Sequence, residues 1–417
     1  MQKTVHIIGA GISGLSAAVR LANANYRVNV HEATQTAGGR CRSYFDAATN
    51  LMIDNGNHLL LSGNRHALAY ARSIGAEAGL VGPKRAQFPF VDLSSGQRWQ
   101  IDLGDGRLPL WVFDEARRVP DTGLLDYLAL MPLIWAGTDK LVGKAIPCAG
   151  TLYQRLVQPL LLAALNVDPP EGSAGLAGAI VRETLLAGGR ACRPLIARDG
   201  LSSVLIEPAV KLLQDKGATI QFGHELREFV MAGSHIGGLK FGDDTIAVAA
   251  DDVVVLAVPP RPAAALLPKL KTPTKFRAIV NAHFRFDPPK DAPAILGVVG
   301  GLVEWLFAFP QRLSVTISNG DRLVDMPREE LALAIWRDVC KAGGVRGDLP
   351  PWQIVRERRA TFEATPEQNA LRPGPVTALK NLFLAGDWTD TGLPATIEGS
   401  VRSGDRAADL VLAMRQA

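Results

Sequence analysis

The sequence predicts an α/β protein with two interleaved domains, and three observations lead to that prediction. A glycine-rich turn, Gly9–Gly14, stands between a β-rich run and a helix-like run, which is the context of a nucleotide-binding turn. An acidic residue, Glu32, ends the next β-rich run. The length of 417 residues exceeds one ordinary hydrophobic core. Together they predict a Rossmann-like nucleotide-binding domain with an α+β substrate-binding domain inserted into it.

The first turn has the pattern GxGxxG over Gly9-Ala10-Gly11-Ile12-Ser13-Gly14. A strand is expected at Thr4–Ile8 and a helix at Leu15–Asn23. In this motif the first glycine permits the tight turn, the second lets a pyrophosphate approach the backbone, and the third lets the helix pack on the strand. The free N–H groups and positive dipole end of the helix then favour phosphate. We therefore expect Gly9, Gly11, Ile12, Ser13 and Gly14 to bind a dinucleotide, since strand and helix flank the motif.

A second strand, Arg27–His31, is followed by Glu32 and Ala33. Glu32 lies 18 residues beyond the last glycine of the turn. A carboxylate at this distance accepts hydrogen bonds from ribose hydroxyls and repels a 2′-phosphate. Glu32 and Ala33 thus predict FAD or NAD rather than NADP.

Six residues after Glu32 comes Gly38-Gly39-Arg40. Nothing in an NAD site demands this element. Two glycines let the backbone approach a bound group closely, and an arginine supplies a cation. The alternative is a surface loop with a solvated arginine.

With these glycines, Glu32 and Arg40 in this order, the sequence resembles the large family of FAD-dependent amine oxidases and carotenoid desaturases. The resemblance implies FAD and a Rossmann-like FAD-binding domain of the type that carries a GGR element (GR2-type). The stretch Ile53–His58 (IDNGNH) is similar in kind to the family's next turn along the flavin. That similarity implies Gly56, Asn57 and His58 at the flavin. His58 has two readings, one facing the flavin and one as a structural hydrogen-bonding residue.

The C-terminal stretch 382–408 resembles the closing flavin element of the same family. A short strand, Leu382–Ala385, ends at Gly386-Asp387, and a helix is expected from about Thr396. The resemblance implies that Asp387, beside Gly386, binds the ribityl or phosphate region and that the helix start at Thr396 and Ile397 faces the flavin N1–C2=O edge. A helix N-terminus favours the negative charge of a reduced flavin. This stretch holds no cysteine or histidine, so noncovalent FAD is expected.

A third stretch completes the predicted FAD-binding domain. Strands are expected on either side of Gly223 and in 251–260, and the resemblance implies that Leu226 contacts the adenine. We predict an FAD-binding domain from residues 1–61, 191–269 and 376–417. Residues 62–190 and 270–375 are assigned to the substrate-binding domain.

The predicted substrate domain is strongly apolar. A hairpin is expected over 98–113 with its turn at Gly104-Asp105-Gly106, followed by helical stretches at 123–137 and 152–167. The longest uncharged runs have 12 residues, which is shorter than the roughly 17–25 of a membrane span. These stretches fit a buried helical core, or a tunnel wall that dips into a bilayer surface. Aromatic residues in 294–310, namely Trp305, Phe307 and Phe309, either line a channel and stabilise a cation or pack in the core.

Three middle stretches resemble the squalene-associated branch of the family, the hydroxysqualene dehydroxylases: RWQIDLGDGRLPLWVF, RVPDTGLLDYLAL and LYQRLVQPLLLAALNVDPPEGSA. The resemblance implies reductive removal of the hydroxyl of hydroxysqualene to give squalene, in squalene and hopanoid biosynthesis. An acid protonates the hydroxyl, water leaves, and N5 of reduced FAD delivers hydride to the allylic carbocation. The catalytic acid is unknown. His58 and Glu304 are candidates, and Glu304 has the alternative reading of a surface charge.

Three rival functions share this fold. A carotenoid (phytoene-type) desaturase would use the same tunnel oxidatively, and no residue separates the two. An amine oxidase needs a polar pocket, against which the apolar stretches argue. A prenyl-binding escort protein would bind lipid without flavin, against which the intact Gly39, Arg40, Gly386 and Asp387 argue.

Composition bounds the partners and the compartment. A net charge of +4 without a dense basic tract excludes a nucleic-acid partner and is compatible with loose attraction to an anionic membrane. The four cysteines form no CxxC pair and the seven histidines no HExxH pattern, so no metal or disulfide is expected. With no signal peptide before the first strand, we expect a cytoplasmic protein on the inner face of the membrane. Its expected partners are a long apolar isoprenoid substrate and enzymes of the squalene pathway.

Overall fold

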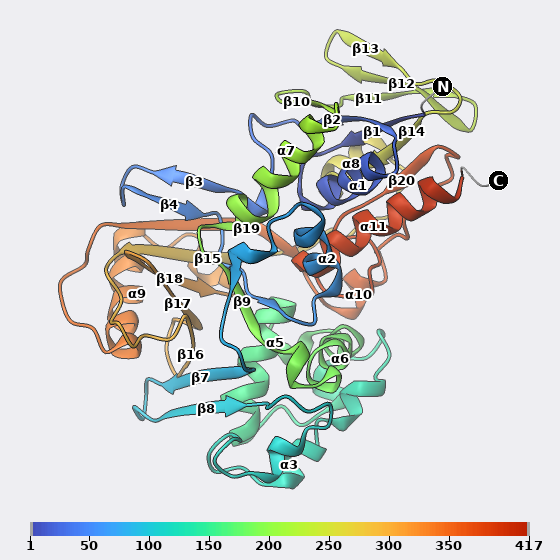
Figure 1. Ribbon diagram of the computed structural model, residues 1–417. Helices are drawn as coiled ribbons and strands as arrows, with labels where there is room; N and C mark the ends of the chain where they lie inside the picture. Colours follow the sequence, from blue (N-terminus) through green and yellow to red (C-terminus); the bar gives the residue numbers. More distant parts are fainter. Residues whose placement is uncertain (1–2, 415–417) are drawn as a thin grey trace.

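The structure is a computed structural model that describes residues 3–414. The outermost residues of the first and last predicted segments, 1–2 and 415–417, lie outside it. Figure 1 shows an elongated body in three parts. A nucleotide-binding sheet with helices α1, α7 and α11 occupies one end, a large mixed sheet with α9 lies to one side, and short helices around α3 form the opposite end.

The nucleotide-binding part is built on a five-stranded, wholly parallel sheet in the order β10-β2-β1-β14-β20. Its central strands are short runs of Val, Ile and Leu buried on both faces, as a parallel sheet covered by helices requires. Helices α1, α7, α11 and α2 share one apolar cluster with this sheet. The bounds are β1 Thr4–Ile8, β2 Arg27–His31, β10 Thr219–Gln221, β14 Val253–Leu256, β20 Leu382–Leu384, α1 Ile12–Asn23, α7 Glu207–Asp215, α11 Ile397–Ala413 and α2 Arg65–Ser73.

The sheet's strands come from three separate stretches of the chain, which the sequence predicts for the FAD-binding domain. Helix α2 follows the predicted boundary at residue 61, yet its buried face packs in the cluster of this sheet. Smaller elements surround the sheet: the antiparallel meander β11 Glu228–Ala232, β12 His235–Phe241 and β13 Asp244–Ala247, the hairpin β3 Ser43–Asp46 and β4 Leu51–Asp54, the three-stranded β5 Leu60–Leu61, β9 Pro194–Ala197 and β6 Leu80–Val81, and helix α8 Pro260–Leu266.

The second large sheet has seven strands in the order β19-β15-β18-β17-β16-β7-β8. Alternate residues face opposite sides. One face packs on α9 through Val280, Val315, Leu306 and their neighbours, and the other carries Asn281, Thr316 and Trp305. The bounds are β7 Gln87–Asp92, β8 Arg98–Asp102, β15 Phe276–Arg285, β16 Ile295–Val299, β17 Trp305–Phe309, β18 Arg312–Ile317, β19 Trp352–Phe362 and α9 Arg328–Gly343.

The remaining part is a set of short helices broken by prolines. Helix α3 ends before Pro132, so the predicted stretch 123–137 does not form one helix. The stretch 152–167 is helical over 151–165, with a π-helical segment Tyr153–Val157 that leads into α5. Among residues 3–414 no helix has both the length and the apolar character needed to cross a membrane. The bounds are α3 Leu124–Leu128, α4 Val142–Ala145, α5 Gln158–Leu165, α6 Ala174–Glu183 and α10 Pro366–Asn369, with short 3-10 helices at Leu110–Phe113 and Met131–Trp135.

The predicted α/β fold class is confirmed, with two local differences. Strands β1 and β2 have the predicted bounds. Helix α1 begins at Ile12 rather than Leu15, because the last glycine of the turn lies inside the first helical turn. There a Cβ on Gly14 would overlap the carbonyl oxygen of Gly9, so only glycine fits.

The hairpin predicted over 98–113 is wrong. Strand β8 pairs with the preceding β7, and its turn lies at 93–97. Asp92 forms that turn, since its carboxylate accepts the N–H of Ser94 at 2.9 Å, and Gly96 adopts a φ of +74°. Beyond β8, Pro109 lacks an N–H for a return strand, and the chain forms a 3-10 helix instead.

Gly297 on β16 leaves room for an aromatic ring. A Cβ at this position would overlap the ring of Phe90 on the neighbouring strand. We expect Gly297→Ala to lower the free energy of unfolding by about 1–3 kcal/mol, because the ring must leave its place. Urea denaturation measures the change. Gly374→Ala, where a Cβ meets nothing within 4 Å, is the control and should be neutral. A neutral Gly297→Ala would contradict this packing.

Candidate active site

The glycine turn after β1 forms an open cradle at the start of α1. Gly9 has a φ of +106° and donates its N–H to the carbonyl of His31 at 2.8 Å. Helix α1 begins after Gly11 without a side-chain cap, so its first N–H groups point into the cradle. A Cβ on Gly11 would meet nothing within 4 Å. The predicted Ile12 and Ser13 lie in this first turn and are buried.

Glu32 lies beside this cradle at the end of β2 and is 9% exposed. Its carboxylate accepts the N–H of Ala10 at 2.7 Å and the N–H of Thr34 at 2.9 Å. The hydroxyl of Thr34 is a third donor at 2.8 Å. A carboxylate has about four acceptor positions, so one is left for a ribose hydroxyl. Ala33 follows Glu32 and is exposed.

The Gly38-Gly39-Arg40 element folds back onto the glycine turn. Gly38 donates its N–H to the carbonyl of Ala10 at 2.8 Å, and both glycines have positive φ values. Arg40 extends to the other end of the chain, where its guanidinium pairs with the carboxylate of Asp387 at 2.7 Å. It also donates to the carbonyl of Ala360 on β19. The alternative of a free surface loop is therefore wrong.

Asp387 follows β20 at the same edge of the sheet. Gly386, with a φ of +144°, donates its N–H to the hydroxyl of Ser403 on α11. Thr396 caps α11 by accepting the N–H of Gly399 at 3.0 Å, and Ile397 begins the helix. The N-terminal and C-terminal segments thus meet, and helices α1 and α11 pack side by side (Figure 1).

Arg372 is a functional-site residue that the sequence does not reveal. It is 7% exposed and donates to the carbonyl of Asp387 at 3.2 Å and to the hydroxyl of Thr391 at 3.0 Å. It therefore holds the loop that carries Asp387. Burial lowers the pKa of Arg372 to about 10, so it stays charged at neutral pH. No sequence motif surrounds it, since its partners lie on a loop 15 to 19 residues away.

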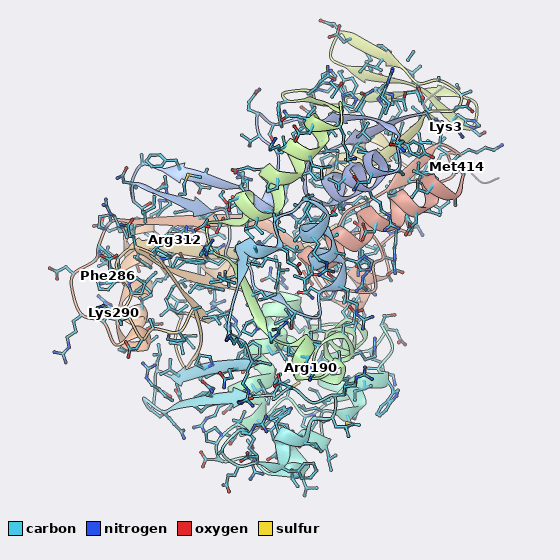
Figure 2. All side chains as sticks on the ribbon, in the orientation of Figure 1. Lys3, Arg190, Phe286, Lys290, Arg312 and Met414 are labelled. Carbon is cyan, nitrogen blue, oxygen red and sulfur yellow. The ribbon has the colours of Figure 1, made fainter. Side chains whose placement is uncertain are left out.

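The predicted turn at Ile53–His58 joins the two sheets. Asp54 is buried and accepts from the hydroxyl of Ser43 at 2.6 Å and the N–H of Leu201 at 2.8 Å. Arg312, labelled in Figure 2, lies where the β3–β4 hairpin meets the large sheet and donates to the carbonyl of Met52. Gly56 packs closely against Asn281. A Cβ at Gly56 would lie only 3.2 Å from the side-chain nitrogen of Asn281.

Asn57 anchors this turn to the large sheet. Its side-chain amide donates to the carbonyl of Val315 at 3.1 Å and to the hydroxyl of Thr316 at 3.2 Å. Its side-chain oxygen is buried and has no hydrogen-bond partner among the described residues. Such an atom calls for a donor that the chain itself does not provide. Asn281 and Thr316, on separate strands, are further contacts that sequence reasoning missed.

His58 follows Asn57 and is partly buried. Burial lowers its pKa to about 4, with the Arg40 charge acting in the same direction. At neutral pH the imidazole is therefore uncharged. A neutral imidazole cannot serve as the strong acid that protonates a hydroxyl group, so its charge argues against the acid role considered for His58.

The sheet face beside Asn57 and Thr316 is aromatic. Trp305 pairs with Thr316 across β17 and β18, and its ring lies 5.7 Å from Phe90, which stacks on Trp99 at 5.5 Å. Phe307 and Phe309 are buried in the same apolar cluster. Both readings of the 294–310 stretch stay open, because these rings pack in the core and also face the side of Asn57.

Glu304 precedes Trp305 and is partly buried, so the reading as a plain surface charge is wrong. Its carboxylate accepts the N–H of Ser318 at 2.8 Å, just after β18. Glu304 lies just before β17, between Val303, which belongs to the apolar cluster of α9, and Trp305, which belongs to the aromatic cluster. The acid role considered for Glu304 therefore stays a prediction.

The pKa of Glu304 makes a testable contribution to stability. Burial raises this pKa from 4.5 to about 7. Between these values the unfolded chain has lost the proton that the folded chain keeps, so stability falls as pH rises from about 4.5 to 7. We expect Glu304→Gln to remove roughly 2 kcal/mol of this decline while keeping the acceptor for Ser318. Urea denaturation at pH 5 and pH 7.5 measures it, and an equal decline in both proteins would contradict it.

Leu226 is the residue that the resemblance places at the adenine. It is 7% exposed and shares an apolar cluster with Ile8 and Leu256. Nearby, His224 donates its N–H to the carbonyl of Glu32 at 2.8 Å. The Nδ1 atoms of His224 and His31 lie 3.0 Å apart. Burial lowers the pKa of His31 to about 3. The segment after β10 therefore lies against the end of β2.

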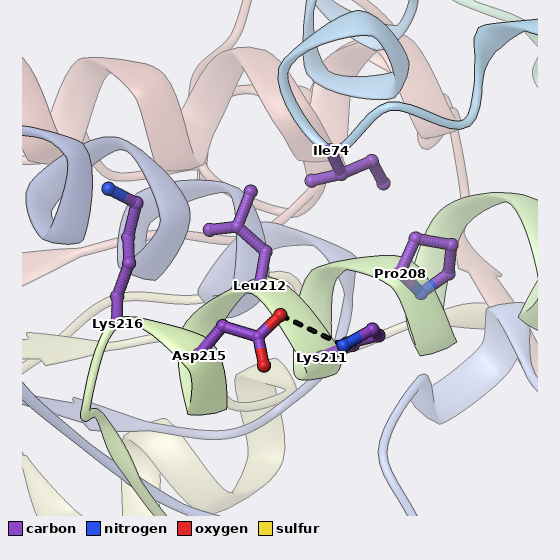
Figure 3. Close-up of a pocket in the computed structure, with 6 residues that line it drawn as sticks. All are labelled: Ile74, Pro208, Lys211, Leu212, Asp215 and Lys216. Carbon is purple, nitrogen blue, oxygen red and sulfur yellow. Dashed lines mark hydrogen bonds and ion pairs between the residues drawn. The ribbon is translucent and has the colours of Figure 1, made fainter.

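A shallow hollow and the cysteines are further features of residues 3–414. The hollow in Figure 3 lies along α7 and is lined by Ile74, Pro208, Leu212 and Lys216 together with the ion pair of Lys211 and Asp215 at 2.9 Å. Among residues 3–414 no cluster of three or more His, Cys, Asp or Glu side chains could hold a metal ion. The four cysteines, Cys41, Cys148, Cys192 and Cys340, are free thiols.

Comparison with known proteins identifies the class. The model of the flavin containing amine oxidoreductases matches residues 12–412. In fold, the chain is similar to cyclohexylamine oxidase of Brevibacterium oxydans, with a TM-score of 0.75 at 18% identity over the full length of both chains. The protein therefore belongs to the flavin containing amine oxidoreductase family, and such membership implies FAD.

The particular group follows from closer relatives. The chain is 75% identical over 412 residues to hydroxysqualene dehydroxylase of Sinorhizobium fredii, covering 99% of both. It is 71% identical over 418 residues to that of Rhodopseudomonas palustris, covering 100% of both. Within the flavin family it belongs with the hydroxysqualene dehydroxylases, as a flavin-dependent oxidoreductase.

The residues of the site fit FAD. The open space at Gly11 suits a pyrophosphate against bare backbone, while the uncapped start of α1 supplies N–H donors. Glu32 has an acceptor position left for a ribose hydroxyl. The orphaned oxygen of Asn57 lies on the turn between the two sheets, where a bound group could supply its donor.

Proposed function

We propose that this protein removes the hydroxyl group of hydroxysqualene reductively and releases squalene, as a step of squalene biosynthesis. The observation that carries the proposal is the 71–75% identity to two hydroxysqualene dehydroxylases over their whole lengths. A chemical argument supports it independently. An aromatic, apolar sheet face borders the predicted flavin turn at Asn57, which suits a hydrocarbon substrate better than a polar amine.

We propose that FAD is held noncovalently by the three chain segments predicted for it, 1–61, 191–269 and 376–417, with the substrate held by 62–190 and 270–375. The pyrophosphate is assigned to the glycine turn, the adenosine ribose to Glu32, and the adenine to Leu226. Arg40 and Asp387 act together as one ion pair across the site. The proposed contact residues are Gly9, Gly11, Ile12, Ser13, Gly14, Glu32, Ala33, Gly38, Gly39, Arg40, Gly56, Asn57, His58, Leu226, Gly386, Asp387, Thr396 and Ile397.

When bound, reduced FAD supplies a hydride from N5. The chain itself contributes shelter and charge stabilisation. Loss of water from protonated hydroxysqualene leaves an allylic cation, and the faces of Trp305 and its neighbours attract a cation through their ring quadrupoles. The buried apolar wall keeps out water that would recapture the cation. The neutral His58 adds no opposing positive charge.

Product analysis tests this function. Holoprotein with chemically reduced flavin is incubated anaerobically with hydroxysqualene, and oxidised holoprotein with phytoene, and the lipids are analysed by mass spectrometry. We expect squalene in the first reaction and unchanged phytoene in the second. Desaturated phytoene with unchanged hydroxysqualene would replace the proposal by the carotenoid desaturase. Colourless protein that binds isoprenoid without reaction would replace it by an escort protein.

A further inference from the structure

The far end of the molecule carries a concentrated apolar surface. Of the 17 large apolar side chains exposed among residues 3–414, eight lie between positions 108 and 135. We call the six most exposed of them the apolar patch. Its members and exposed fractions are Leu108 68%, Leu110 64%, Phe113 66%, Leu125 80%, Leu128 59% and Trp135 73%. A group of this kind on one segment marks an interaction surface rather than ordinary scatter.

The patch is built by three short elements that the fold holds in place. These are the 3-10 helix Leu110–Phe113 with its lead-in, α3, and the 3-10 helix Met131–Trp135. Trp111 is buried beneath them and meets Tyr127 of α3 edge to face at 5.4 Å. Figure 1 shows α3 at the end of the molecule opposite the nucleotide-binding sheet. The patch is therefore a supported surface that leaves the nucleotide-binding sheet clear.

The interior beneath the patch is apolar as far as the proposed reaction site. Trp111 and Leu133 belong to the same buried cluster as Trp99, Phe90 and Trp305. The last of these pairs with Thr316, which holds the Asn57 turn. The packed interior between the patch and the flavin turn is therefore apolar.

Charge around the patch favours one kind of partner. Residues 105–144 hold six acidic and five basic side chains, and Arg155 and Arg182 also bond to this segment, so its charges are nearly balanced. Asp121 is neutralised by Arg155 at 3.1 Å, and Asp126 accepts the N–H of Gly123 as the cap of α3. A neutral rim gives no basic attraction to anionic lipid and no charge pattern for a protein partner. Tryptophan and leucine on short amphipathic elements are typical of insertion into the bilayer interface.

We propose that the apolar patch inserts into the lipid bilayer surface and orients the protein so that hydroxysqualene enters from the membrane. The part about substrate entry rests on the proposed function, whereas the membrane contact does not. Insertion is hydrophobic, so binding needs no anionic lipid and resists salt, because screening acts on charges rather than on apolar contact. This replaces the loose electrostatic attraction that the net charge of the whole chain suggests.

Vesicle sedimentation tests the surface. FAD-loaded protein is mixed with phosphatidylcholine vesicles at 0.1 and 0.5 M NaCl. We expect wild-type protein to sediment with the vesicles equally at both salt concentrations, and the variant F113S/L125S/W135S to partition at least tenfold less. The control F45S/M52S/M231S, which removes three exposed apolar side chains from the other parts of the molecule, should bind as wild type. Flavin absorbance and circular dichroism confirm that each variant is folded.

Unchanged sedimentation of the patch variant would overturn the proposal. So would wild-type protein that binds only vesicles containing phosphatidylglycerol, and only at low salt. A third contradicting result is a wild-type protein that is dimeric and binds no vesicles, together with a patch variant that is monomeric. Turnover separates this proposal from the proposed function. Loss of vesicle turnover with retained turnover in detergent micelles supports the surface. If neither system yields squalene, the function fails, while the sedimentation result still decides the membrane contact.

Discussion

Replacing Gly11 with alanine is expected to give a folded, colourless protein. A Cβ at Gly11 meets nothing within 4 Å in the chain itself, and the backbone there, with φ −70° and ψ 170°, accepts any residue. The fold should therefore be unaffected. The methyl group would occupy the place assigned to the pyrophosphate, so we expect FAD affinity to fall about 100-fold, which corresponds to ~2.7 kcal/mol.

Flavin titration of the apoprotein, followed by fluorescence quenching, measures this affinity, and urea denaturation of the apoprotein measures stability. Gly374→Ala is the matched control, since that position is open as well but lies on an exposed loop. It should leave both quantities unchanged. If Gly11→Ala binds FAD with wild-type affinity, the assignment of the pyrophosphate to this turn is wrong.

Replacing Arg40 with methionine is expected to damage both stability and cofactor retention. Asp387 is 6% exposed, and loss of Arg40 leaves its carboxylate buried without the 2.7 Å ion pair. Because the Arg40 side chain is 38% exposed, solvent screens part of the effect, and we expect a loss of about 2–3 kcal/mol. The FAD content of the purified protein should fall as well, since the pair joins the two chain ends of the site.

Arg40→Lys keeps the charge without the second donor to Ala360, so it should recover part of the stability. Arg358→Met is the control, because its ion pair with Asp325 at 2.9 Å is exposed on both sides and should contribute little. If Arg40→Met retained FAD and stability like this control, the pair would be a surface contact without a role in the site.

The sequence predicts the nucleotide-binding half well because its signals are local. Strand, glycine turn and helix follow one another within the first 23 residues. Gly9 and Gly14 answer steric demands that the structure contains, whereas Gly11 leaves open space. The family resemblance assigns both Arg40 and Asp387 to the FAD site, whereas the ion pair between them, 347 residues apart in the sequence, is found only in the structure.

Contacts between segments far apart in the chain could not be predicted from the sequence. Asn57 donates hydrogen bonds to Val315 and Thr316 on a strand more than 250 residues away, and no local sequence pattern predicts these bonds. The hairpin over 98–113 was wrong because a Gly-Asp-Gly turn signal competed with the Asp92 turn, and the partner strand lay upstream. The hydrogen bond from Ser318 to Glu304 also joins residues that only the folded chain brings together.

The central claim is that the protein is a flavin-dependent reductive dehydroxylase, and an anaerobic single turnover tests it most directly. The bound flavin is reduced, hydroxysqualene is added, and visible absorbance is followed while samples are extracted for mass spectrometry. The account predicts one squalene for each flavin reoxidised, with matching rates. A flavin that stays reduced while hydroxysqualene is recovered unchanged would contradict it.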